Sequence, residues 1–148
     1  MATTGFLLLC DYASRSMGGK LNIMGIYERL VVNELPVRIP HAYLVLRVLI
    51  DPSEAGKKHS FKLDMVNDED KELMKIEGFF DVPPLPEDID IDELRHDEIF
   101  PLYGPVLEDE GEYLFRVWLD EELDSTIPLY INMVKRSADK TPAKKDEE

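Results

Sequence analysis

Apolar residues in this chain alternate with polar ones, and the clearest example is the segment GEYLFRVWLDEELDSTIPLYINMV, residues 111–134. One row of alternate side chains in its first half comprises Tyr113, Phe115, Val117 and Leu119. A matching row in its second half comprises Ile127, Leu129, Ile131 and Met133. A period of two is the pattern of β-strands, whose successive side chains point to opposite faces. The segment therefore predicts two strands, joined by a turn over the acidic stretch 120–125.

The opposite face of this predicted hairpin also carries large apolar side chains. They are Leu114, Trp118 and Tyr130. A strand with one face in water normally places polar residues there. We therefore expect this second face to be covered by residues 83–105 or exposed as a contact surface for a partner protein, which could be a second copy of the chain. These three residues are the interface candidates.

Strand patterns recur along the whole chain, and no segment keeps a helical period for longer than two turns. The predicted hairpin turns lie at Gly18-Gly19, at 67–70 and at 120–125. We expect about seven or eight strands. Because helices do not alternate with them, parallel α/β folds are excluded. The predicted fold class is all-β, an antiparallel β-sandwich or a flattened barrel.

The 148 residues suffice for one domain with a sizeable core. We place this single β-sandwich domain at residues 1–134. Residues 135–148 are charged and almost free of large apolar side chains. Such a composition cannot bury enough apolar surface to fold, so we expect a disordered C-terminal tail.

The formal net charge of −14 is concentrated in the middle of the chain, where residues 64–124 hold 22 Asp or Glu and four Lys or Arg. A field of this sign repels phosphate backbones and anionic lipids, so we expect no nucleic-acid partner and no membrane partner. It attracts cations or a basic protein. An acidic mimic of a nucleic-acid backbone is a further alternative.

The chain has a single cysteine, Cys10, so it cannot form an internal disulfide. A chain without disulfides is typical of a reducing cellular compartment. The apolar run 6–10 is short and no Lys or Arg precedes it, so it does not fit a signal peptide. No stretch approaches the roughly 18 apolar residues of a membrane span. We expect the protein to be cytoplasmic.

The run EDIDIDE places Asp88, Asp90 and Asp92 two residues apart. Carboxylate oxygens on a flexible loop are suitable ligands for Ca²⁺. The regular alternation of these aspartates with isoleucine favours instead a short edge strand with a charged outer face. The three aspartates are the metal-binding candidates, and a ligand- or calcium-binding β-sandwich is the alternative function.

Sequence patterns of catalysis are missing. The three histidines share no metal-ligand spacing with one another or with Cys10. No serine lies in a nucleophile elbow, and no Gly-rich loop opens a helix. We therefore expect no enzyme activity, no catalytic residues and no cofactor. The expected function is a non-enzymatic interaction module that binds a protein partner or itself.

The N-terminal segment LLLCDYASRSMGGKLNIMGIYERL resembles a small bacterial family of unknown function. The shared features are a Cys/Ala-Asp-Tyr-Ala strand, a Gly-Lys-Leu-Asn turn and an Ile-x-Gly-Ile/Ala-aromatic continuation. Later features, including GEYLFRVWLD, extend the resemblance over residues 6–134. It implies a compact β-rich fold and carries over no catalytic residues. The positions that it implies to be architectural are Asp11, Tyr12, Gly19 and Gly25.

Overall fold

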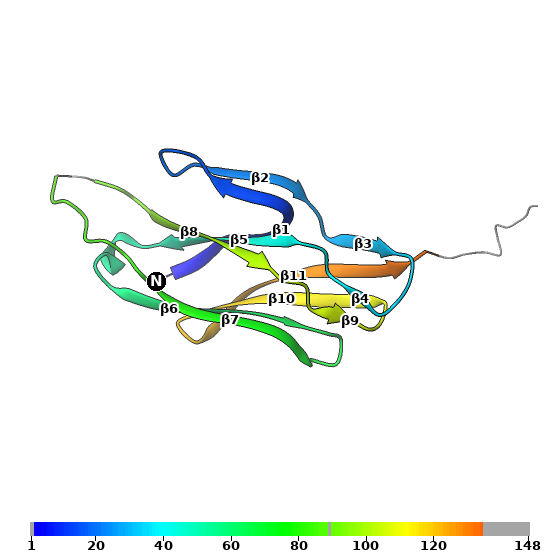
Figure 1. The fold of residues 1–148 in the computed structure, drawn as a ribbon. Coiled ribbons are helices and arrows are strands. Elements are labelled where there is room, and N and C mark those ends of the chain that lie inside the picture. The colour runs from blue at the N-terminus through cyan, green and yellow to red at the C-terminus, as the bar shows by residue number, and fades with distance from the viewer. Residues whose placement is uncertain (1, 89, 135–148) are drawn as a thin grey trace, which may run out of the picture.

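The computed structural model describes residues 2–88 and 90–134, whose regular elements are β-strands apart from one short 3-10 turn, η1 (Pro52–Glu54) (Figure 1). The strands are β1 (Ala2–Arg15), β2 (Leu21–Ile26), β3 (Arg29–Val32), β4 (Val37–Arg38), β5 (Ala42–Ile50), β6 (Lys58–Val66), β7 (Glu72–Asp81), β8 (Leu94–Leu102), β9 (Val106–Leu107), β10 (Gly111–Leu119) and β11 (Glu122–Met133). Eight of them have six residues or more, and β3, β4 and β9 are shorter. The all-β prediction is confirmed.

Two sheets packed face to face make up the fold (Figure 1). The first has four strands in the order β2-β1-β5-β8, and the second has five in the order β3-β11-β10-β6-β7. Among the described strands, β4 and β9 form a separate small pair. Every pairing in the two main sheets is antiparallel except that of β3 with β11. The predicted antiparallel sandwich is therefore confirmed, with one parallel edge strand added.

The main core lies between the two sheets. The four-stranded sheet contributes Leu7, Leu9, Leu44, Leu46 and Val48. The five-stranded sheet contributes Leu63, Met65, Tyr113, Phe115, Val117, Leu119, Leu129 and Ile131. The row predicted for β10 is thus confirmed, and each member is at most 5% exposed. Met133 was predicted in the matching row of β11 but is 39% exposed, because it is the last residue of that strand.

The turn between β10 and β11 is tighter than predicted. Only Asp120 and Glu121 separate the two strands, and their φ angles are 49° and 72°. Positive φ at both central residues matches the right-handed twist of a hairpin and lets the strands pair up to the turn. Residues 122–125, predicted as loop, therefore belong to β11. The other two predicted turns, at Gly18-Gly19 and 67–70, are confirmed.

β1 is long enough to pair with two neighbours. Residues 2–10 pair with β5 and residues 10–15 pair with β2, so the β1–β2 hairpin rises above the rest of its sheet in Figure 1. A second small core forms beneath this curled hairpin, with Cys10, Ala13 and Val45 buried. The apolar run 6–10 in β1 has no polar alternation because this strand packs against a core on each of its faces.

Gly25 is the position in this hairpin that requires a glycine. Its φ is +71°, and a Cβ there would lie 2.4 Å from Oδ2 of Asp11. A side chain would meet both a strained backbone and a steric clash. The contact gives a structural reason for Asp11 and Gly25, two of the positions that the family resemblance implies to be architectural.

The segment that begins at Pro83 is rich in proline and acidic residues and precedes β8. Strand β8 pairs with β5 at the edge of the four-stranded sheet. Asp88, Asp90 and Asp92 lie before β8 and outside any strand. The prediction of a short edge strand in this run is therefore wrong. Three prolines at 83, 84 and 86 remove ladder donors, and regular pairing begins only at Leu94.

Within the part of the chain that the structure describes, no helix has the length and apolar character to cross a membrane. The predicted disordered tail, residues 135–148, lies outside the described residues.

Candidate binding groove on the five-stranded sheet

The outer face of the five-stranded sheet carries Trp118 among charged side chains. In register, Trp118 of β10 lies opposite Lys62 of β6, and Lys62 lies opposite Glu77 of β7. One step along the sheet, Arg116 lies opposite Asp64. Side chains directly opposite each other on neighbouring strands share one face and touch. These five residues therefore form one continuous surface.

Asp64 is fully buried, although it belongs to this outer face. Nε and Nη2 of Arg116 each donate a hydrogen bond of 2.8 Å to its carboxylate. Nε1 of Trp118 donates a third, of 3.3 Å. The paired carboxylate raises the pKa of Arg116, chiefly through these hydrogen bonds. A position that alternates with buried Leu63 and Met65 is normally exposed to water, but Arg116 and Trp118 cover the carboxylate of Asp64 here.

The indole ring of Trp118 is fixed by its neighbours. Nζ of Lys62 lies 4.7 Å from the ring centroid, and Cζ of Arg116 lies 5.3 Å from it. Cations near an aromatic ring are attracted by its quadrupole, and the hydrogen bond to Asp64 sets the direction of the ring. Trp118 is half-buried by these contacts. Residues 83–105, expected as one possible cover, belong to the opposite sheet or its loops.

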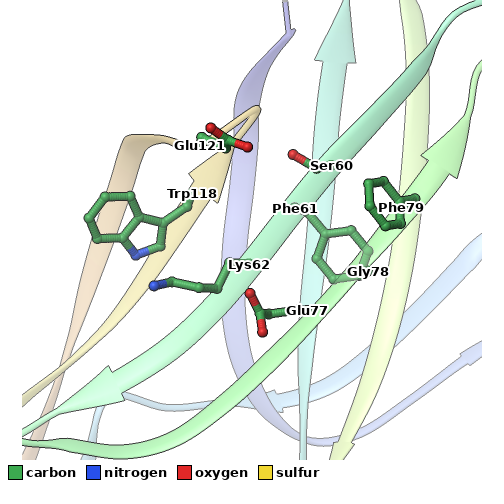
Figure 2. A pocket seen from close by; sticks show the side chains of 8 residues that line it. All are labelled: Ser60, Phe61, Lys62, Glu77, Gly78, Phe79, Trp118 and Glu121. Atoms are coloured by element: carbon green, nitrogen blue, oxygen red, sulfur yellow. The ribbon is translucent and has the colours of Figure 1, made fainter.

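A groove of about 550 Å³ separates Trp118 from Phe79 of β7 (Figure 2). Phe79 is 67% exposed, and Nζ of Lys58 lies 4.8 Å from its ring centroid. In Figure 2, Lys62 and Glu77 lie between the two aromatic side chains, and Glu121 lies at the hairpin turn. The remaining lining residues are Ser60, Phe61 and Gly78.

Chemically, the groove joins two aromatic walls with charges of both signs. Aromatic faces accept cations and pack on apolar groups. Glu77 and Glu121 can accept hydrogen bonds, while Lys62 can donate them. Aromatic and charged groups of this kind suit the recognition of a polypeptide segment.

Of the three predicted interface residues, only Trp118 lines this groove. Leu114 pairs with Val66 and Pro128 further along the sheet. Tyr130 lies near the far end of β11, where Cζ of Arg29 is 4.9 Å from its ring centroid. The three therefore do not share one site.

Phe79 and Lys62 are among the groove residues that the sequence prediction missed. A signal for Phe79 existed, since it lies two residues beyond Glu77 and four beyond Lys75 and therefore shares their wet face of β7. Its proximity to Trp118 depends on the pairing of the β6–β7 hairpin with β10, which lies far along the sequence.

The predicted calcium candidates, Asp88, Asp90 and Asp92, are all exposed. Over residues 2–88 and 90–134, no group of three or more His, Cys, Asp or Glu side chains is arranged to hold a metal ion. The calcium alternative therefore gains no support from the described residues.

Two of the three histidines meet on one aromatic ring. His59 and His96 both stack on Phe80, with centroid distances of 5.4 Å and 4.4 Å. His59 is buried, and its Nδ1 lies 2.8 Å from Oδ2 of Asp120. Oδ1 of Asp120 accepts a hydrogen bond from the Ser60 amide. Asp120 thus joins the β10–β11 turn to β6.

Asp120 gives a pH-dependent prediction. Burial raises the pKa of this carboxyl group, but the hydrogen bonds from His59 and Ser60 outweigh it and lower the pKa below its ordinary value. A carboxylate with a depressed folded pKa stabilises the fold above the unfolded pKa of about 3.9, and this contribution is lost as pH falls through the folded pKa. We predict that Asp120→Asn lowers the melting temperature at pH 7 and that the difference from wild type shrinks below about pH 4. Thermal unfolding of both proteins over a range of pH measures this difference in melting temperature.

Glu121→Gln is the control for Asp120→Asn, because it removes one carboxylate from the same turn. The role given to Asp120 would be wrong if the difference between Asp120→Asn and wild type stayed constant from neutral to acidic pH.

No curated protein matches the chain at a significant level. One family model does match, from the first part of β1 to the penultimate residue of β11, so it covers the described sandwich almost completely. The predicted resemblance to a family of unknown function is confirmed. The chain belongs to the family of unknown function DUF6941, whose model matches residues 5–132.

Proposed function

We propose that this chain is a non-enzymatic interaction module whose groove between Trp118 and Phe79 binds an extended, basic segment of a partner protein. The observation that supports this most is the fixed orientation of Trp118, held by Asp64 and by two cations. An aromatic side chain that is ordered before binding loses little conformational entropy when a partner packs on it. Phe79 offers a second aromatic face across the groove.

The charge around the groove favours a basic segment. The chain between residues 64 and 124 supplies β7 and β10 and contains 22 carboxylates against four cations. Glu77 and Glu121 line the groove itself. Opposite charges accelerate the encounter of two proteins, and the effect falls as salt screens it. The same field disfavours nucleic acids and anionic lipids as partners.

The two aromatic walls also favour a partner that carries lysine or arginine. Each ring already lies against an ammonium group of this chain, Lys62 at Trp118 and Lys58 at Phe79. Both lysines sit on β6 and can exchange with cations of a bound segment, because a cation–π contact at an exposed ring is worth only about 0.5–1 kcal/mol. We place the module in the cytoplasm, where the buried free thiol of Cys10 would stay reduced.

Comparative capture from extracts of the native host tests this function. Immobilised wild type should retain a partner at low salt and release it as salt is raised. We predict that Phe79→Ala loses this partner, with a stability change within about 0.5 kcal/mol because Phe79 is largely exposed.

Tyr103→Ala is the matched control for Phe79→Ala, since Tyr103 is 80% exposed and lies outside the groove. Equal capture by wild type and Phe79→Ala would show that the groove is not the binding site. Release that is insensitive to salt would show that the partner is not recognised by its charge.

A further inference from the structure

The outer edge of β2 differs from the other edges of the two main sheets. The six residues of β2, LNIMGI, contain no charged side chain and no proline. The edge strands β7 and β8 each contain at least three charged residues, and β8 also contains a proline. The fourth edge strand in the described chain, β3, has only four residues and begins with an arginine. Charges, proline and short length protect an edge from pairing with another chain, and β2 has only its modest length for protection.

Exposed apolar side chains accompany this edge. Met24 is 64% exposed and Ile26 is 58% exposed. Tyr12, which lies opposite Met24 on β1, is 50% exposed. Leu21 and Ile23 pack instead against the second small core and hold β2 in place. The strand is therefore ordered, while its edge and one apolar face are free to make contact.

Charge indicates which partner fits this edge. Two copies of a chain with a net charge of −14 repel each other, so they can meet most easily where the local charge is near zero. Residues 11–29, which include the β1–β2 turn and β2, hold three cationic side chains and two carboxylates. A two-fold contact brings the same surface of both copies together.

We propose that β2 pairs with β2 of a second copy, antiparallel about a two-fold axis, so that the two four-stranded sheets become one continuous sheet. Backbone hydrogen bonds would form between residues 21–24 of the two copies. The positive φ of Gly25 ends the regular edge after Met24. Pairing brings Met24 of each copy against the other copy, extends the apolar face that Met24 shares with Tyr12, and buries part of the Met24 side chain.

This dimer leaves the groove open, since the groove lies on the five-stranded sheet and β2 belongs to the other sheet. The self-association surface and the proposed partner site are therefore independent, and each can fail without the other.

Light scattering of the full chain over a range of concentrations tests the proposal. We expect a dimer that becomes tighter as salt screens the repulsion between the two acidic copies. Met24→Lys places a charge on the edge and should raise the dimer dissociation constant by at least about tenfold. Met17→Lys is the matched control, because Met17 is 98% exposed at the tip of the same hairpin and outside β2.

Several results would overturn the β2 contact. The first is a wild type that stays monomeric at every protein and salt concentration. The second is a Met24→Lys variant that dimerises as tightly as Met17→Lys. The third is a dimer that is dissociated by Phe79→Lys at the β7 edge and not by Met24→Lys.

Hydrogen exchange of the unmodified chain provides a check that needs no variant. Amides of residues 21–24 should be more protected at high concentration than at low concentration, and a dimer without this added protection would place the contact elsewhere.

Discussion

Phe115→Ala is expected to lower the free energy of unfolding by about 3–5 kcal/mol. Phe115 is 1% exposed at the middle of β10, and it lies opposite Met65 on one side and Ile127 on the other. Its removal takes away the transfer free energy of the ring and leaves a cavity between the sheets. Because the total stability of a domain of this size is about 5–15 kcal/mol, the variant should be close to unfolding at ambient temperature.

Urea unfolding followed by circular dichroism measures the loss on Phe115→Ala. Leu123→Ala is the control on the same hairpin, since Leu123 is 49% exposed and should cost far less. A loss below about 1 kcal/mol for Phe115→Ala would mean that the two sheets collapse into the vacated space, contrary to the close packing expected of a core.

Phe115 also illustrates what the sequence predicts well. Alternation along a strand is set by local geometry, so without knowledge of the neighbouring strands it placed the whole apolar row of β10 correctly, and the row of β11 except for Met133 at its end. Glycines and polar residues likewise identified the turns at Gly18-Gly19 and 67–70. The turn at Asp120 was assigned too long, because acidic residues that prefer loops also tolerate the exposed first positions of β11.

Contacts between strands far apart in the sequence were not predictable in the same way. Asp64 and Arg116 are 52 residues apart, and only the pairing of β6 with β10 brings them together. Alternation along β6 is sufficient to put Asp64 on the outer face of the sheet, but it cannot reveal that Arg116 and Trp118 cover the carboxylate. The parallel pairing of β3 with β11 and the two partners of β1 also depend on long-range topology.

The candidate groove shows the same limit. Trp118 was recognised as unusual for a strand face, but its cover was sought in residues 83–105 or in a partner. The structure places Lys62 and Arg116 against its ring instead. Phe79 becomes part of the site only because β7 pairs with β6, so a single-sequence pattern identifies one wall of the groove and misses the other.

Arg116→Met is expected to lower the free energy of unfolding by about 3–5 kcal/mol. The variant keeps most of the side-chain volume but removes both donors of the bidentate pair from a carboxylate that is 0% exposed. Trp118 still donates to the carboxylate, and Nζ of Lys62 lies 3.8 Å from Oδ2 of Asp64, so these two groups offset only part of the loss. A buried carboxylate without its ion-pair partner carries a desolvation cost that the remaining contacts do not offset.

A double variant distinguishes this electrostatic cost from a loss of packing. Asp64→Leu together with Arg116→Met replaces the ion pair by apolar groups, and such a replacement is often close to neutral. The double variant should therefore be more stable than Arg116→Met alone, as measured by urea unfolding. If the losses of the two single variants simply added, the pair would contribute by packing only.

Trp118 is the single tryptophan of the chain and donates to Asp64, so its fluorescence reports the geometry directly. An emission maximum that shifts in Asp64→Leu but stays unchanged in the Glu77→Gln control would show that the buried carboxylate holds this wall of the groove in place.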